Sequence, residues 1–381
     1  MLSDVITPFT TEPEWLAQRS RLRRAFLDSL GTFPESLSYL VGSDGAGRAT
    51  DRTTAAKGSR PSVRSEETAR TIDGDLTRVE LRYHVIGDYW TDVVILAPPG
   101  FDRPDAPPRP VVLTIHGTNR ERGKYSLMDP AGRPNRAYAS ELAGRGFIAV
   151  APDQFGFGPD SRELGQEALF ERFYADFPEW SLDGMRLASH MRLIDLLASR
   201  ELSSAGPQDD DGGQGAAAGI DGPTERAGRD QALLRVGAIG NSLGGRAVIH
   251  LAAVDERVAA AVVSTGISPN YSNVYRHIKR PGQLKSPRLT EKLAADGISP
   301  WDYQHLIALC APRNLLIIEP WNDPYNPDTA GAMDCTAKAA AVYRLLDRPE
   351  ALRLLVHGDG HDTTERTRSY AYDFLADGVA P

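Results

Sequence analysis

The feature that most constrains this 381-residue chain is an apolar strand that runs into a glycine-flanked serine and then a helical pattern. The strand covers 234–239, the turn reads Gly240-Asn241-Ser242-Leu243-Gly244-Gly245, and a helix is predicted over 243–254. Small residues flank the serine because the backbone turns sharply there, with little room for side chains. The pattern therefore predicts that Ser242 stands above the end of a sheet, beside the free N–H groups of a helix start.

Strands that alternate with helices after residue 110 indicate a parallel sheet, and the fold class expected is α/β. Continuous apolar runs, typical of strands covered on both faces, occur at 111–115, 147–151, 258–264, 314–318 and 352–356. Helices are predicted over 14–30, 136–143, 182–200, 330–346 and 366–375. Upstream, 79–86 and 92–97 predict an antiparallel hairpin, whereas 42–76 has almost no apolar pattern and predicts a long surface connection.

Charge and hydropathy exclude several kinds of partner. The formal net charge is -8 at pH 7, and no nucleic-acid partner is expected because phosphate binding needs a basic surface. No run approaches the ~20 apolar residues that span a bilayer, and the N-terminus carries acids where a signal peptide is basic. We expect a cytoplasmic protein without a membrane partner, and a homo-oligomer stays open. Cys310 and Cys335 are too few for a disulfide framework or zinc site and are expected as free, buried thiols.

A serine oxygen is a weak nucleophile unless a base takes its proton, and a carboxylate then orients that base. On sheets that carry this turn, the acid and the histidine follow the serine in that order, each after a later strand. The loop after 314–318 offers Asp323 and its competitor Glu319, and we favour Asp323. Beyond it lie only His357 and His361, and we favour His361, because the glycines of its loop permit a tight excursion.

An oxyanion hole needs two backbone N–H donors aimed at the developing negative charge. Leu243 N–H, at the helix start, is the first candidate. The loop after 111–115 begins His116-Gly117-Thr118, and we expect Thr118 N–H as the second donor, with Gly117 as the alternative. His116 is then a buried histidine that braces this loop.

Taken together, these motifs resemble those of the α/β-hydrolase superfamily, and more narrowly its dienelactone hydrolase and acetylxylan esterase-like branch. The matching segments within 79–378 are His116-Gly117, Ala-Pro-Asp-Gln-Phe-Gly-Phe-Gly at 151–158, 240–245, Ala-Pro-Arg at 311–313 and Gly360-His361. The resemblance implies an eight-stranded, mostly parallel sheet with helices on both faces. It also implies that Ser242, Asp323 and His361 are nucleophile, acid and base. Asn241 departs from the family, in which many relatives have His, Glu or Cys before the serine.

The same reasoning divides the chain. We expect 1–78 to be an N-terminal helical extension with the surface connection, and 79–381 to be the hydrolase domain. Within it, 203–230 is polar and low in complexity and predicts a flexible insertion. The segments 155–182 and 265–305 follow strands at the serine's end of the sheet and are expected as lids. Their aromatic residues either line a substrate pocket or pack the lids, and both interpretations stay open for Phe155, Phe157, Trp180, Tyr271 and Tyr275.

The leading hypothesis is a serine hydrolase that cleaves a carboxylic ester, such as an acetyl ester or a lactone, through an acyl-enzyme. Its expected partner is a small-molecule ester, and no cofactor or metal is expected. Acyl transfer, peptide hydrolysis and biosynthetic cyclisation would use the same three residues. A non-catalytic binding protein is a further alternative, because a fold alone does not fix function.

Overall fold

One mixed sheet of nine strands organises the computed structural model, which describes residues 11–42, 61–103, 105–129, 134–199, 234–270 and 299–379. The strand order is β1-β2-β3-β5-β4-β6-β7-β8-β9, antiparallel from β1 to β5 and parallel from β5 to β9. The strands are β1 (Ser65–Asp73), β2 (Leu76–Ile86), β3 (Tyr89–Ala97), β4 (Val111–Ile115), β5 (Ile148–Pro152), β6 (Val236–Asn241), β7 (Val258–Ser264), β8 (Asn314–Pro320) and β9 (Leu352–His357).

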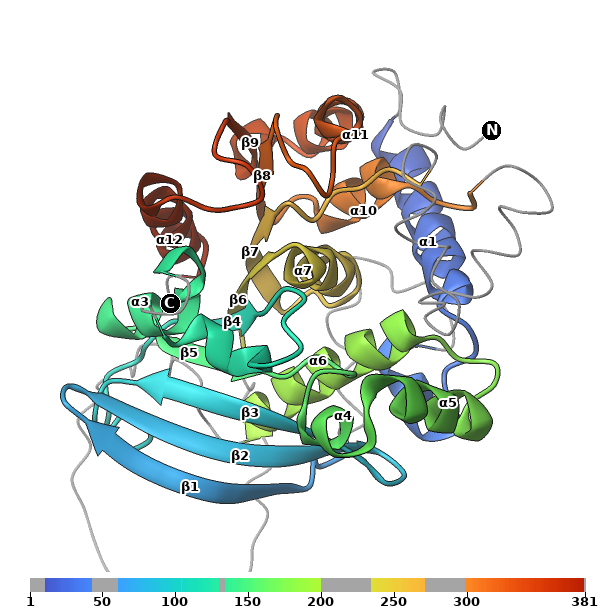
Figure 1. Ribbon diagram of the computed structural model, residues 1–381. Coiled ribbons are helices and arrows are strands. Elements are labelled where there is room, and N and C mark those ends of the chain that lie inside the picture. Colours follow the sequence, from blue (N-terminus) through green and yellow to red (C-terminus); the bar gives the residue numbers. More distant parts are fainter. Residues whose placement is uncertain are drawn as a thin grey trace, which may run out of the picture.

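Helices cover both faces of the parallel part (Figure 1). One face packs against α3 and α12, and the other against α6, α7, α10 and α11. The helices are α1 (Glu12–Ser29), α2 (Ser38–Val41), α3 (Tyr138–Gly144), α4 (Pro159–Leu164), α5 (Gln166–Asp176), α6 (Leu182–Ser199), α7 (Leu243–Val254), α10 (Tyr303–Cys310), α11 (Thr329–Leu345) and α12 (Glu365–Val379). Because neither face meets water, every residue of β4, β5, β6 and β7 is buried, as the continuous apolar runs predict.

The predicted α/β class is confirmed, and so are the hairpin, now β2 and β3, and the parallel strands that follow it. The helices predicted over 14–30, 182–200, 243–254 and 330–346 are found within a few residues. Cys310 and Cys335 are free and buried, as expected. No helix in the described part of the chain is both long and apolar enough to cross a bilayer.

The surface connection predicted over 42–76 is wrong for 65–73, which forms β1, the ninth strand and one edge of the sheet. Hydrophobic periodicity misses this strand because its sequence, Ser-Glu-Glu-Thr-Ala-Arg-Thr-Ile-Asp, is mostly polar. Backbone pairing with β2 holds it instead, together with a cross-strand ion pair between Glu66 and Arg82 at 2.7 Å. Charged side chains on an edge strand also discourage pairing with another chain.

The N-terminal helix α1 packs against the far side of the α7–α10 layer. Phe26 lies between His250 of α7 and Trp301, with ring centroids 4.9 and 5.0 Å away. Trp301 Nε1 also donates a hydrogen bond to Ser29 Oγ at 2.7 Å. The predicted insertion 203–230 and most of the predicted lid 265–305, including Tyr271 and Tyr275, lie outside the described residues.

Candidate active site

Ser242 sits at a strained turn between β6 and α7, with φ 59° and ψ −119°. The left-handed region is costly for a residue with a Cβ, so the surrounding contacts must hold it there. Ser242 N–H donates to Ser264 O at 2.8 Å and to Thr265 Oγ1 at 2.9 Å. The flanking glycines leave room for the turn: a methyl group on Gly244 would overlap Ile115 O, and one on Gly245 would lie 2.5 Å from Ser264 O. The predicted strand–serine–helix turn is therefore present.

The loop after β4 faces this turn, as the sequence predicts. A methyl group on Gly117 would lie 3.6 Å from Ser242 Cβ and 3.1 Å from Asn241 O, so the Gly117 backbone is in contact with the nucleophile turn. Leu243 is the first residue of α7, and the first N–H groups of a helix have no acceptor within the helix. The start of α7 at Leu243 and the Gly117 loop thus both lie next to Ser242.

The structure brings Asp323 and His361 together. Asp323 follows β8, His361 follows β9, and His361 Nδ1 lies 2.6 Å from Asp323 Oδ2. The competitor Glu319 is fully buried inside β8, where Oε1 accepts from Ile267 N–H at 2.9 Å. His357, the competing histidine, accepts from Asp359 N–H at its Nδ1 instead. Of the two carboxylates and two histidines, the favoured pair is the one in contact.

The environment of Asp323 keeps it ionised. Burial raises the pKa of this carboxyl, but hydrogen bonds from His361 and from the N–H groups of Tyr325 and Asn326 outweigh burial and leave the pKa below its usual range. An ionised Asp323 can only accept, so the proton shared with His361 belongs to Nδ1. His361 Nε2 therefore carries the lone pair that a general base needs.

Side-chain hydrogen bonds hold the His361 loop. Asn322 makes a reciprocal pair: its Nδ2 donates to Gly358 O at 2.8 Å, and its Oδ1 accepts from Gly360 N–H at 2.9 Å. Gly360 has φ +68°, a conformation that glycine adopts without strain. Arg136 donates to the carbonyl of His361. The loop is therefore clamped from both β8 and the segment before α3.

A buried chain of hydrogen bonds joins the two halves of the site. Asn241 Nδ2 donates to Ser264 Oγ at 3.0 Å, and Ser264 Oγ lies 3.1 Å from Thr363 Oγ1. Thr363, two residues after His361, also contacts Tyr138 Oη at 3.1 Å. Because an amide N–H₂ can only donate, the hydrogen of Ser264 is free to point to Thr363. Asn241, the departure from the family pattern, thus begins a link from the serine turn to the histidine loop.

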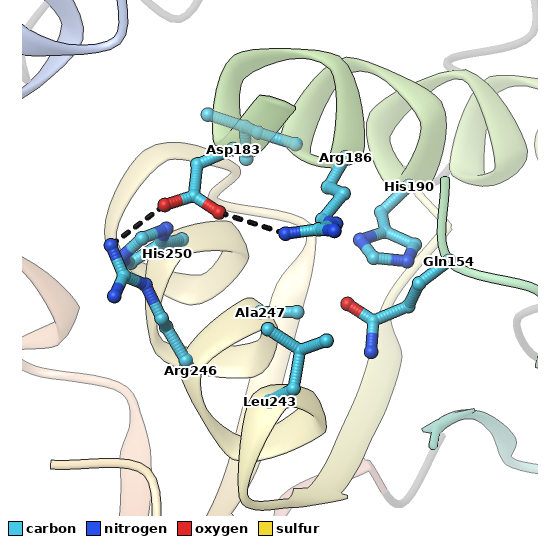
Figure 2. A pocket seen from close by; sticks show the side chains of 9 residues that line it. Gln154, Asp183, Arg186, His190, Leu243, Arg246, Ala247 and His250 are labelled. Atoms are coloured by element: carbon cyan, nitrogen blue, oxygen red, sulfur yellow. Dashed lines mark hydrogen bonds and ion pairs between the residues drawn. The ribbon is translucent and has the colours of Figure 1, made fainter. Parts of the chain in front are cut away.

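Beside Leu243 lies a small cavity between the first turns of α6 and α7 (Figure 2). We call it the α6–α7 cavity; it is lined by Gln154, Asp183, Arg186, Leu187, His190, Leu243, Arg246, Ala247 and His250. Its volume of about 10 Å³ suits roughly one water molecule or one comparable group. Asp183 bridges two guanidinium groups, Arg246 Nη2 at 2.6 Å and Arg186 Nη1 at 3.2 Å.

The rest of the lining combines neutral polar side chains with the apolar Leu187, Leu243 and Ala247. Burial lowers the pKa of both His190 and His250 to about 3, so both rings are uncharged near neutral pH. Both ring nitrogens of His190, and Oε1 of Gln154, have no hydrogen-bond partner within the described ranges. A small group that both donates and accepts could satisfy them, because a neutral imidazole offers one donor and one acceptor. Neither in this cavity nor in the rest of the described ranges do three His, Cys, Asp or Glu side chains gather as metal ligands.

Three of the aromatic residues proposed for a pocket, Phe155, Phe157 and Trp180, are buried, in line with the alternative that they pack the lids. Phe155 and Trp180 join an aromatic cluster with Phe173, at centroid distances of 5.2 and 5.8 Å. Phe157 packs edge-on against His116 at 5.4 Å. None of these three residues is among the lining of the α6–α7 cavity.

Sequence reasoning missed the charged lining of this cavity. In the pattern of α6, Asp183 and Arg186 look like a solvated face, yet both are at most 5% exposed. Their counterpart Arg246 lies on α7, so the pairing across helices is invisible to periodicity along one helix. The available signal was the three-residue spacing of Asp183 and Arg186, which allows an ion pair on a helix.

The strand order of the nine-stranded sheet, with a strained serine turn between β6 and α7, defines the class: the chain has the α/β-hydrolase fold. No family model matches the chain. A protein of Bacillus subtilis (strain 168) named "Putative hydrolase YtaP" is 24% identical over 273 residues, 70% of this chain and 78% of that protein. 

Solved structures show the same fold at low identity. A "Glucuronoyl Esterase from Solibacter usitatus" aligns over 98% of this chain and 95% of its own length, with a TM-score of 0.67 and 16% identity. "Methylesterase BT1017" aligns over 97% of this chain with a TM-score of 0.58 and 16% identity, and the chain spans 65% of its length. The predicted resemblance to α/β-hydrolases is thereby confirmed at the level of the fold.

Proposed function

We propose that this protein is a serine hydrolase that cleaves carboxylic esters through an acyl-enzyme, with Ser242 as nucleophile, His361 as base and Asp323 as acid. The observation that carries the proposal is the 2.6 Å contact between His361 Nδ1 and Asp323 Oδ2. It occurs at the same sheet edge as the strained Ser242 turn, in the chain order serine, acid, histidine. The esterases among the solved structures with this fold are consistent with the proposal.

In this mechanism Ser242 Oγ attacks the ester carbonyl carbon while His361 Nε2 takes its proton. The carbonyl oxygen becomes an oxyanion held by Leu243 N–H and by Thr118 or Gly117 N–H. As the tetrahedral intermediate collapses, His361 gives its proton to the leaving alkoxide, and an alcohol departs. Water, activated by the same histidine, then releases the carboxylic acid and restores Ser242. Asp323 stays ionised and stabilises the imidazolium in both halves.

The test is hydrolysis of p-nitrophenyl acetate by the full chain and by Ser242→Ala, with the exposed Ser36→Ala as the matched control. Ser242→Ala is expected to lose all hydrolysis above background, whereas Ser36→Ala keeps the parent rate. A fluorophosphonate should label Ser242, with the adduct located by peptide mass spectrometry. Full activity in Ser242→Ala, or labelling elsewhere, would refute the assignment.

The physiological ester requires a second measurement. Acetylated sugars and methyl esters of sugar acids form a suitable panel, because the solved structures with this fold are named as a methylesterase and a glucuronoyl esterase. Adding an alcohol acceptor separates hydrolysis from acyl transfer. A new ester formed at the expense of the free acid would favour the transfer reaction.

A further inference from the structure

The loop that carries the second oxyanion donor is held by a histidine ring beneath it. His116 is fully buried, and its two ring nitrogens contact two different backbones. Nδ1 lies 2.7 Å from the carbonyl oxygen of Gly117, and Nε2 lies 3.1 Å from the backbone nitrogen of Gln154. The ring therefore joins the loop after β4 to the loop after β5.

These contacts determine the tautomer. A backbone N–H only donates, so Nε2 must hold its lone pair toward Gln154 N–H. Burial lowers the pKa of His116, which leaves the ring neutral with a single N–H. That hydrogen is on Nδ1, and it donates to Gly117 O. The direction of the bond at Gly117 is thus set by the bond at Gln154.

A bond to Gly117 O also orients the N–H of the next residue. The carbonyl of Gly117 and the N–H of Thr118 belong to one planar peptide unit, and in a trans unit they point in opposite directions. With the oxygen held down toward the buried His116 ring, the Thr118 N–H points away from the ring. A methyl group on Gly117 would lie 3.6 Å from Ser242 Cβ, so the Gly117–Thr118 peptide lies beside the nucleophile.

We propose that His116 is a positioning residue that aims Thr118 N–H at the oxyanion, by fixing the Gly117–Thr118 peptide plane. The inference rests on the proposed esterase function and adds a residue that acts through the backbone rather than on the substrate. It also selects Thr118 over Gly117 as the second donor.

Further contacts hold His116 and the loop after β4 in place. Gln154 Nε2 donates to His116 O at 2.5 Å, so His116 is held through its main chain as well as its ring. Farther along the loop, Lys124 N–H and Lys124 Nζ donate to the two oxygens of Asp153 at 2.9 and 2.6 Å. Lys124 and Asp153 are buried, where an ion pair is little screened. Both ends of the loop are therefore anchored to the segment after β5.

Two amide substitutions test the two hydrogen bonds of the His116 ring one at a time. In His116→Asn the side-chain nitrogen can occupy the place of Nδ1 and still donate to Gly117 O, but nothing reaches Gln154 N–H. In His116→Gln the amide oxygen can occupy the place of Nε2 and accept from Gln154, but the donor to Gly117 O is lost. We expect kcat of His116→Asn to stay within about threefold of the parent. For His116→Gln we expect a fall of about 100-fold, the lower end for losing one oxyanion donor, with KM unchanged.

Affinity for a trifluoromethyl ketone distinguishes aiming from mere stability. Such a ketone forms a tetrahedral adduct with the serine and leaves an oxyanion in the hole, so its Ki should rise in His116→Gln in proportion to the loss of kcat. Melting temperatures of both variants are measured alongside. Equal losses of kcat in the two variants, or losses that follow melting temperature instead of Ki, would overturn the proposal.

A second variant keeps the test decisive if His116 substitutions fail to fold. Replacing Thr118 by its α-hydroxy acid analogue removes the N–H while keeping the side chain, and should lower kcat by a similar factor. No loss of kcat there would reject Thr118 N–H as the donor and the role of His116 with it. Failure of the proposed function itself has a different signature, because Ser242→Ala would then remain active.

Discussion

The two halves of the candidate site are held in place by different means. On the serine side, backbone packs on backbone: Gly244 fits against Ile115 O and Gly245 against Ser264 O, and all four residues are buried. On the histidine side, side chains at the surface do the holding. Asn322 is exposed, and the side chain of Asp362, which binds Arg136, is 38% exposed.

Because of this difference, the two sides of the site should differ in how well they tolerate substitutions. A close backbone contact leaves no space for an additional atom. A larger side chain there either fits or displaces a strand. A surface hydrogen bond contributes roughly 1 kcal/mol and can be lost while the loop keeps most of its geometry. The nucleophile is therefore fixed by the fold, whereas the base is adjusted by a set of separate, modest interactions.

The largest effect is expected from Gly244→Ala on the serine side. The added methyl group on α7 would overlap Ile115 O at the end of the buried central strand β4. We expect little folded protein and no esterase activity, as checked by circular dichroism and p-nitrophenyl acetate turnover. Gly144→Ala is the matched control because its Cβ meets open space at the end of α3, and it should behave like the parent. A folded, active Gly244→Ala protein would show that the turn has more freedom than its contacts allow.

On the histidine side, Asp323→Asn should lower kcat by about 10³- to 10⁴-fold while the fold survives. The amide cannot hold the imidazole in the required tautomer or stabilise its charged form. Glu319→Gln is the companion variant, since Glu319 binds Ile267 N–H rather than His361. Steady-state kinetics with melting curves should show a modest loss of kcat for Glu319→Gln. The reverse ranking at equal stability would make Glu319 the acid.

A smaller effect is expected where the two halves meet. Thr363→Val keeps the shape of the side chain but removes the hydroxyl that contacts Ser264 and Tyr138. We expect kcat to fall about tenfold, and Asn241→Ala plus Thr363→Val to fall by less than the product of the two single changes, because both break one chain. Thr71→Val, on the exposed strand β1, is the control. Strict additivity would mean that the chain does not couple the halves.

The smallest effect concerns stability against pH. Because the pKa of Asp323 is lowered in the folded state, its contacts stabilise the protein above the unfolded pKa of about 3.9 and lose that contribution as the pH falls through the folded pKa. Unfolding of the parent and Asp323→Asn in urea should therefore differ most near neutral pH and converge once the pH falls below the folded-state pKa of Asp323. A difference that is constant with pH would mean that the ionised carboxylate is not what stabilises the loop.

The sequence predicted more of the serine side than of its surroundings. Ser242, the strands around it and the facing Gly117 loop follow from a turn that tolerates few residue types. The choice between Asp323 and Glu319 was a preference only, because it depends on which carboxylate reaches back across the sheet edge. The burial of the charged residues of α6 could not be predicted from the sequence. Asp195 Oδ1, for example, lies 2.6 Å from Arg257 Nη1, which is 62 residues away in the sequence. The strand β1 was not predicted, because an edge strand held by backbone pairing does not need an apolar sequence pattern.

The docking of α1 has a consequence for the chain while it is being made. Ser29 and its partner Trp301 are 272 residues apart, so at 5–20 residues per second the helix waits roughly 15–55 s for that partner to leave the ribosome. During this interval the apolar stripe that carries Trp15 and Phe26 lacks the surface that covers it in the finished fold. Helix α1 is thus made long before the surface that covers it, and it is a part of the nascent chain where we expect chaperone binding.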